Sequence, residues 1–278
     1  MHVGVMIFDT DYSMPVNELA VALEERGFES LFVPEHTHIP ASRESAWPGG
    51  ADLPRDYWHT FDPFVSLSFA AAATTKLKVG TGICLLPQRD TIVAAKLVAS
   101  LDRMSGGRFL FGIGGGWNKE EMGHHGVAYN QRFARMEEQI AAMKGLWQEE
   151  EFGYEGDHVK FTPSWAHPKP VQTPNPPILL GGETDYTLRR VVNYCDGWLP
   201  RARHGFDAAE NMTRLREIAD SVGRSMETLC VTVFGAPGDR ATLASYQEAG
   251  IERALLGLPS ADKDVVLPML DKFQGLLK

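Results

Sequence analysis

Cysteine and long apolar runs are scarce in this sequence. Its three cysteines, Cys84, Cys195 and Cys230, are far apart and form no C-x-x-C pair. This spacing argues against a disulfide framework and favours a reducing compartment. No apolar run approaches the roughly 20 residues that a membrane-spanning helix needs. The amino-terminal MHVGVMIFDTD lacks the pattern of a signal peptide and is predicted to begin a strand, so we expect a cytoplasmic protein with no membrane partner.

An excess of positive charge is also missing. The chain has 27 Lys and Arg against 36 Asp and Glu, a formal net charge of −9, and no run of basic residues. This balance argues against nucleic acid and against an anionic membrane surface. The expected partner is a small-molecule substrate. An anionic ligand would need a local pocket of backbone N–H groups and arginines.

Short β-rich runs alternate with longer amphipathic runs along the whole chain. The 278 residues, 44% of them hydrophobic, are enough for one large core. Strands that alternate with helices of this length predict right-handed crossovers and a parallel sheet. We therefore predict an α/β fold, a (β/α)8 TIM barrel formed as a single domain over residues 1–278, with an open doubly wound sheet as the alternative. The predicted strands are 3–8, 30–36, 77–86, 108–116, 176–182, 197–201, 229–237 and 253–259.

Two connections are longer than ordinary loops. One is 37–61, after the second strand, and the other is 151–175, between the fourth helix and the fifth strand. The second is predicted to contain a small hairpin around Gly156-Asp157. Long loops in a compact domain are usually functional, and simple decoration is the other interpretation.

The stretch RFLFGIGGGWNKEE, residues 108–121, resembles a nucleotide-binding loop but does not fit one. A dinucleotide fingerprint would need glycine where Trp117 or Lys119 stands, and no G-K-[ST] follows for a Walker A loop. A strand end without side chains remains, with Gly115 and Gly116 followed by an aromatic residue. This pattern is consistent with a flat polycyclic cofactor or with a tight corner.

Two other strand ends are rich in glycine. Gly181 and Gly182 precede Thr184 at the start of a predicted helix, and together they form a possible anion cradle. Gly80 and Gly82 indicate a bulge, a close approach of a ligand, or small-residue packing. A site for a ring beside a site for a phosphate favours a flavin-like mononucleotide.

His36 is the candidate proton-transfer residue, because histidine exchanges protons near neutral pH. It would lie at the carboxyl end of the second strand, where TIM barrels place their active sites. Its neighbour Glu35 would orient it or form a salt bridge at the rim. A histidine that is merely hydrogen-bonded to the rim is the structural alternative.

Two other protein classes share parts of this pattern. His36 and His38 spell H-x-H, which suggests a metal-dependent barrel hydrolase, but only His204 fits as a further ligand and we assign no metal site. A cofactor-free binding protein with the same fold is the other class.

The chain resembles the luciferase-like monooxygenase superfamily, in particular its oxidoreductases that depend on the deazaflavin coenzyme F420. The resemblance runs through most of the chain. It is carried by FVPEH, by the block from DPFVSLSFAAAATTKLKVGTGICLLPQRD to FGIGGGWNKEEM, and by QRFARMEEQIAAMKGLW, HPKPVQTPNPPILLGG and CDGWLP.

This resemblance implies a set of roles. A non-prolyl cis peptide would fall at Gly82-Ile83 behind the ring, and Glu35 and His36 would lie beside the reactive edge. Glu121 would have a structural role. The remaining cofactor contacts would be Gly115, Gly116 and Trp117 along the ring and its chain, and Gly181, Gly182 and Thr184 at the phosphate.

The resemblance also implies the activity, together with a homodimer. Some members have a carboxylate proton donor where Trp117 stands, so sugar-phosphate dehydrogenase activity is not expected and acid–base work would fall to His36 or Glu35. The predicted function is hydride transfer between coenzyme F420 and a small organic substrate at the mouth of the barrel. An FMN-dependent monooxygenase that uses molecular oxygen is the alternative.

Overall fold

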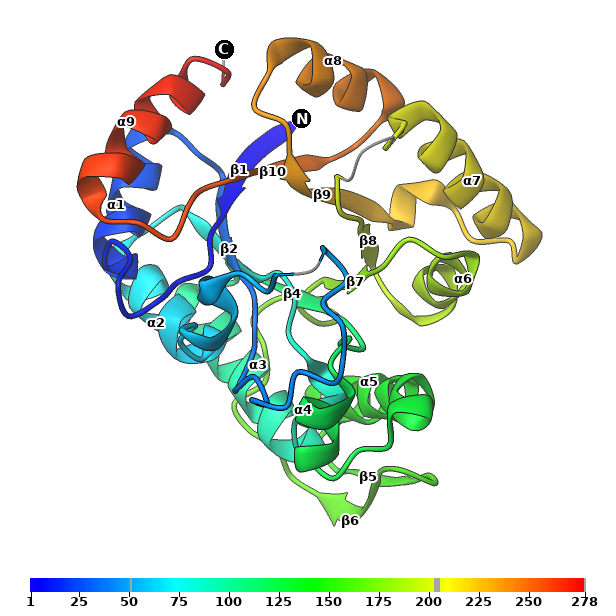
Figure 1. The fold of residues 1–278 in the computed structure, drawn as a ribbon. Coiled ribbons are helices and arrows are strands. Elements are labelled where there is room, and N and C mark those ends of the chain that lie inside the picture. Colours follow the sequence, from blue (N-terminus) through cyan, green and yellow to red (C-terminus); the bar gives the residue numbers. More distant parts are fainter. Residues whose placement is uncertain (51, 203–205, 278) are drawn as a thin grey trace.

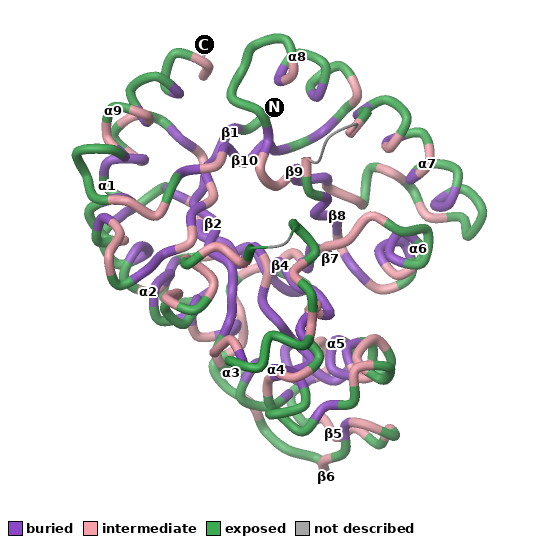
Figure 2. Tube along the Cα trace, in the orientation of Figure 1, coloured by how far each residue is buried: buried purple, intermediate pink, exposed green. Residues whose placement is uncertain are grey.

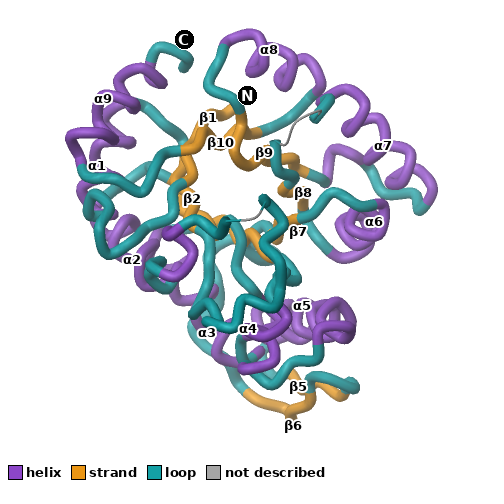
Figure 3. The backbone as a smooth tube through the Cα atoms, in the orientation of Figure 1, coloured by secondary structure: helices purple, strands orange, loops and turns teal. Residues whose placement is uncertain are grey.

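Eight parallel strands close into a barrel, as the alternating pattern predicts. The computed structural model describes residues 1–50, 52–202 and 206–277. Within them the order around the barrel is β1-β10-β9-β8-β7-β4-β3-β2, and Figure 3 shows these strands as a central ring. The barrel strands are β1 (His2–Met6), β2 (Ser30–Val33), β3 (Lys78–Thr81), β4 (Phe109–Ile113), β7 (Ile178–Gly181), β8 (Gly197–Leu199), β9 (Cys230–Ala236) and β10 (Arg253–Gly257).

Helices surround the ring of strands (Figure 1). Side chains cap several of them: Asp62 accepts from two backbone N–H groups at the start of α2, and Asp90 accepts from one at the start of α3. The helices are α1 (Val16–Arg26), α2 (Pro63–Ala73), α3 (Thr91–Ser105), α4 (Lys119–His124), α5 (Arg132–Gln148), α6 (Asp185–Tyr194), α7 (Ala208–Ser221), α8 (Arg240–Ala249) and α9 (Lys263–Gln274). Pro268 lies inside α9, which continues past it.

The two long connections take different forms. The first, 37–61, contains a short 3-10 helix, Arg55–Trp58. The second contains the predicted hairpin, formed by β5 (Phe152–Glu155) and β6 (Lys160–Ser164). This hairpin projects from the barrel (Figure 1). The hairpin strands β5 and β6 lie between β4 and β7 in the chain but are not part of the barrel. The barrel strand that pairs with β4 is therefore β7, with Phe111 opposite Ile178.

The core has two parts, which is typical of a barrel. A small cluster inside the ring contains Phe32, Leu110, Leu179, Leu199 and Leu255. A larger cluster lies between the outer faces of the strands and the helices. Figure 2 shows the strands buried and the outward faces of the helices exposed. In the described part of the chain, no helix has the length and apolar character to cross a membrane.

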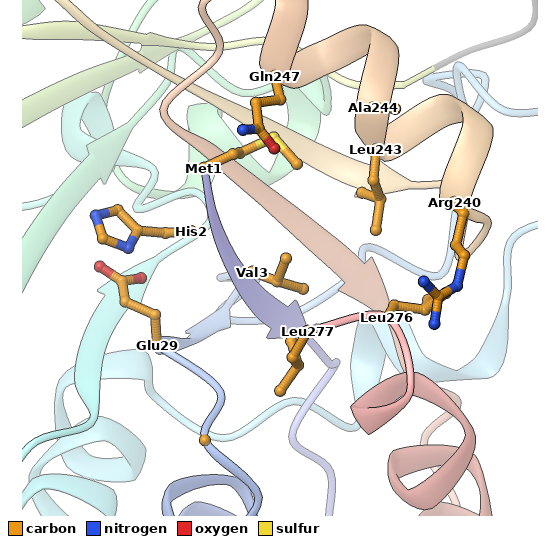
Figure 4. Close-up of a pocket in the computed structure, with 11 residues that line it drawn as sticks. Met1, His2, Val3, Glu29, Arg240, Leu243, Ala244, Gln247, Leu276 and Leu277 are labelled. Atoms are coloured by element: carbon orange, nitrogen blue, oxygen red, sulfur yellow. The ribbon is translucent and has the colours of Figure 1, made fainter.

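A cavity of about 450 Å³ lies at the amino-terminal end of the barrel strands, beside β1 and α8. Figure 4 shows Glu29 and Arg240 among the residues that line it. Both are already engaged: Glu29 pairs with Arg253 at 2.7 Å, and Arg240 donates to the carbonyl of Gly275 at 2.7 Å. This face of a barrel contributes stability. The candidate site is at the opposite, carboxyl-terminal mouth.

Candidate active site

His36 lies at the carboxyl-terminal mouth, just after β2, and a buried carboxylate holds it. Nδ1 of His36 is 2.9 Å from Oε2 of Glu121, and the two side chains are 6% and 0% exposed. The backbone N–H of Thr37 donates to the other oxygen of Glu121 at 3.1 Å. Asn118 caps α4 by accepting from the backbone N–H of Glu121, which fixes the glutamate in the first turn. His36, at the end of β2, is therefore held by Glu121 in α4, the helix that follows β4.

Three more histidines lie outside this pair, near the surface. Nε2 of His38 is 2.8 Å from Nδ1 of His124, and Nε2 of His125 is 2.8 Å from Oγ1 of Thr37. Within the described residues, no three His, Cys, Asp or Glu side chains are arranged to hold a metal ion. His204, the further ligand considered for a metal-dependent hydrolase, lies outside the described residues.

Glu35 takes the salt-bridge role that was one of its two predicted roles. It is 2% exposed; one oxygen accepts from the backbone N–H of Leu85 at 2.8 Å and the other meets Arg89 at 2.7 Å. Arg89 also bridges to Asp62 at 2.6 Å. These bonds tie the end of β2 to the segment after β3. The carboxylate that contacts His36 is thus Glu121 and not Glu35.

Aromatic side chains surround His36. Its ring lies 5.2 Å from that of Tyr57 and 5.8 Å from that of Trp117, measured between centroids. Trp47 packs edge-on against Tyr57 at 5.7 Å, so the 37–61 connection folds back over the mouth. Trp58, by contrast, is 49% exposed and lies outside this wall. A cavity of about 510 Å³ opens beside Trp117, between α4 and the 44–48 segment.

The floor of the mouth is apolar. The peptide bond between Gly82 and Ile83 is cis, at the position that the resemblance implies. Ile83, Met6 and Phe234 are partly exposed and pack on the cluster inside the barrel. A Cβ on Gly114 would lie 2.0 Å from Cδ1 of Ile83. The glycine there therefore makes room for the isoleucine side chain, which forms part of the floor.

The glycine loop after β4 turns sharply before α4. Gly116 has a φ of +72°, a conformation that other residues rarely adopt. A Cβ on Gly115 would lie 2.9 Å from the ring of Phe133 and 3.3 Å from Nε of Arg132. The loop thus packs closely on the start of α5.

Two arginines flank the Phe133 ring beside this loop. The guanidinium carbons of Arg132 and Arg190 lie 4.4 Å and 4.1 Å from the ring centroid. Burial lowers the pKa of Arg132, and the charge of Arg190 lowers it further. Nε of Arg132 is buried and has no hydrogen-bond partner among the described residues. Two neighbouring cations, one of which has an unpartnered donor, are groups whose charge favours a nearby anion.

The segment Gly181–Thr184 forms a helix cap at the rim. Oγ1 of Thr184 accepts from the backbone N–H of Thr187 at 3.2 Å, and the carbonyl of Gly182 accepts from the Trp198 indole at 2.7 Å. Carboxylates flank the cap, since Glu183 pairs with Arg201 and Asp185 pairs with Arg214. Each of these two carboxylates is thus balanced by an arginine at the rim.

Two contacts of the site were not foreseen from the sequence. The resemblance implied a structural role for Glu121, and the structure adds that its carboxylate contacts His36. Arg132 and Arg190 were not singled out for the ligand. A motif could have pointed to Glu121, because Asn118 three residues earlier is a typical helix cap. The two arginines meet only through tertiary packing.

Comparison with known proteins finds relatives over the whole chain. An uncharacterized protein of Mycobacterium tuberculosis is 38% identical over 283 residues, covering 100% of this chain and 99% of that protein. An FMNH(2)-dependent dimethylsulfone monooxygenase of Pseudomonas putida is 38% identical over 124 residues, 43% of this chain and 34% of its own length. The solved structure of an F420-dependent secondary alcohol dehydrogenase in complex with an F420-acetone adduct has the same fold, with a TM-score of 0.77, 17% identity, and coverage of 99% and 97% of the two chains.

A family model assigns the chain directly. The model described as luciferase-like monooxygenase matches residues 10–263, which include every predicted site residue. The family contains F420-dependent and FMN-dependent enzymes among this chain's neighbours. The chain therefore belongs to the luciferase-like monooxygenase family and is an oxidoreductase of that class.

Proposed function

We propose that the chain transfers hydride between coenzyme F420 and a small organic substrate bound at the carboxyl-terminal mouth of the barrel. The observation that carries this proposal is the placement of His36. It is a buried histidine whose Nδ1 is tied to Glu121, and it lies among Tyr57 and Trp117 at the mouth. Such a residue can exchange a proton with a substrate while hydride moves.

The residues at the mouth fit a flat ring with a charged tail. Ile83, Met6 and Phe234 provide an apolar floor against which a ring can bury its face. Gly115 and Gly116 continue from the floor without side chains, and Trp117 adds an aromatic face at the rim. The proposed ring contacts therefore include Gly82, Ile83, Gly115, Gly116 and Trp117.

The buried donor on Arg132 fits the charged tail. Its Nε has no partner among the described residues, and Arg190 lies on the same phenylalanine ring. Both guanidinium groups can donate to phosphate oxygens. We propose that these two arginines balance the charge of the phosphate, while Gly181, Gly182 and Thr184 border it through their backbone.

When bound, the deazaflavin ring supplies the hydride acceptor or donor. The protein's own residues supply the rest. His36 takes the proton from a substrate hydroxyl, or returns it to a carbonyl oxygen. The aromatic wall of Tyr57, Trp117 and Trp47 excludes water from the reacting atoms, and an apolar wall of this kind favours uncharged organic substrates.

FMN is the alternative cofactor. It is supported by the dimethylsulfone monooxygenase, which matches 43% of this chain. The two cofactors have rings of the same outline, so an apolar floor accepts either. They differ in the reaction of the reduced ring with oxygen.

We also propose a cytoplasmic homodimer. The dimer is implied by the resemblance, and it is supported by apolar residues that remain exposed on two adjacent helices. These residues are Val65 and Phe69 on α2 and Ile92 and Val93 on α3, which are 47% to 61% exposed. Burying such a patch against a second copy would remove it from water. Light scattering of the purified protein measures the mass directly.

The function is tested by a turnover assay without oxygen. Purified protein is incubated with reduced F420 and a panel of small ketones and aldehydes, or with oxidised F420 and the matching alcohols. The proposal predicts that the cofactor's visible absorbance changes only when a substrate is present. Turnover that occurs only with reduced FMN and oxygen would instead support the alternative.

A further inference from the structure

Two buried glutamates lie beside the mouth, and they have different basic partners. Glu35 meets Arg89 at 2.7 Å, so its charge is balanced by a residue that is always protonated. Glu121 is 0% exposed. Within the part of the chain that the structure describes, no Lys or Arg lies within ion-pair distance of Glu121, and His36 is its basic partner. The two carboxylates therefore differ in function.

A buried carboxylate is costly unless hydrogen bonds satisfy it. The oxygens of Glu121 have two close donors: the His36 ring at 2.9 Å and the backbone N–H of Thr37 at 3.1 Å. An ionised carboxylate can only accept hydrogen bonds. A neutral His36 ring that donates from Nδ1 to such a carboxylate keeps its lone pair on Nε2.

The hydroxyl of Thr37 in turn contacts two histidines near the surface. Its Oγ1 lies 2.8 Å from Nε2 of His125 and 3.0 Å from Nδ1 of His38. His38 also contacts His124 at 2.8 Å. His38 and His125 therefore contact Thr37 directly, and His124 contacts it only through His38.

We propose that Glu121 is a positioning residue for His36, a role that rests on the proposed function. It selects the tautomer with hydrogen on Nδ1, so that Nε2 is free to accept a proton in the mouth. As hydride leaves the substrate carbon for oxidised F420, the substrate O–H bond breaks, its proton forms a bond to Nε2, and the alcohol becomes a carbonyl. The resulting imidazolium is stabilised by the Glu121 carboxylate, which stays ionised.

The test measures the tautomer directly in the full chain without cofactor. Histidine labelled with ¹⁵N reports which ring nitrogen carries the hydrogen, and a His36→Gln spectrum identifies the signal. Wild-type protein is expected to show hydrogen on Nδ1. In Glu121→Gln, the ratio of the Nδ1–H to the Nε2–H form should fall about tenfold, since an uncharged amide is a weaker acceptor. The adjacent Glu120→Gln is the matched control and should leave the ratio unchanged.

Two results would overturn the proposal. One is a wild-type His36 with hydrogen on Nε2, which needs no variant and so does not depend on the folding of Glu121→Gln. The other is an unchanged tautomer ratio in folded Glu121→Gln. A turnover assay with F420 separates this proposal from the proposed function. The expected tautomer without F420 turnover contradicts the function alone, whereas turnover with the wrong tautomer contradicts only the role of Glu121.

Discussion

Glu29 and Arg253 form a two-pronged ion pair across 224 residues of sequence, with both nitrogen–oxygen distances at 2.7 Å. Glu29 precedes β2 and Arg253 begins β10, the strands on either side of β1. The Arg253 side chain is 1% exposed. Because the pair links the strands that flank β1, it helps to close the barrel at its amino-terminal end.

This pair predicts a pH dependence of stability. Burial alone would raise the pKa of Glu29, but the bonds and charge of Arg253 outweigh burial and lower it from 4.5 to about 2. A carboxyl with a lowered folded-state pKa stabilises the protein fully above about pH 4.5 and loses that contribution as the pH falls toward about 2.

Glu29→Gln removes the two-pronged partner of buried Arg253 and leaves it only the half-exposed Glu252, so it should lower the free energy of unfolding by about 3 kcal/mol at neutral pH. The difference from wild type should narrow as the pH falls below 4.5, because the wild-type carboxyl becomes protonated. Urea titrations of both proteins at several pH values measure this difference in the free energy of unfolding. Glu252→Gln, at a half-exposed neighbour 3.0 Å from Arg253, should cost far less. Equal losses from both variants would contradict the assignment.

His36→Asn tests the acid–base role. An asparagine amide can still donate to Glu121, but it cannot exchange a proton near neutral pH. Turnover should fall by about a hundredfold or more while cofactor binding is kept. His158→Ala, in the 151–175 connection, is the control and should retain turnover. Full activity of His36→Asn would show that another group moves the proton.

Gly116→Ala tests the shape of the loop. Its φ of +72° would be forced on an alanine, while the added Cβ would meet nothing closer than 3.4 Å. The free energy of unfolding should fall by about 1–2 kcal/mol from backbone strain alone. Gly123→Ala, in α4, has open space around the added Cβ and should be neutral or stabilising. A Gly116→Ala protein as stable as wild type would mean that the loop has another conformation.

Arg190→Gln tests the anion site. Removing one of the two guanidinium groups beside Phe133 should raise the Kd for the cofactor about tenfold. This is the change expected from the loss of one charge-assisted hydrogen bond. Added salt should reduce the difference, because it screens the remaining charge. Arg189→Gln, next to it on α6 and exposed, is the matched control. Unchanged affinity in Arg190→Gln would place the phosphate elsewhere.

The barrel could be predicted from the sequence because each strand and helix carries its own periodicity. The short helix α4 was not predicted, since its six residues KEEMGH have no apolar repeat and only the Asn118 cap marks its start. The non-prolyl cis peptide at Gly82-Ile83 followed from the resemblance and is present. That residues 1–278 form one domain stays a prediction.

Site residues could be predicted from the sequence only where their position in the pattern marks them. His36 was found from its place at a strand end. Its partner was missed because Glu121 is 85 residues away and reaches it only when the barrel brings the ends of β2 and β4 together. Arg132 and Arg190 meet across Phe133 for the same reason. The roles of all these residues stay predictions until measured.

The most direct test of the central claim is a parallel titration of purified, cofactor-free protein with oxidised F420 and with FMN, followed by fluorescence. The account predicts saturable binding of F420 in the micromolar range or tighter, and weaker binding in Arg190→Gln than in Arg189→Gln. Saturable binding of FMN with no binding of F420 would contradict it.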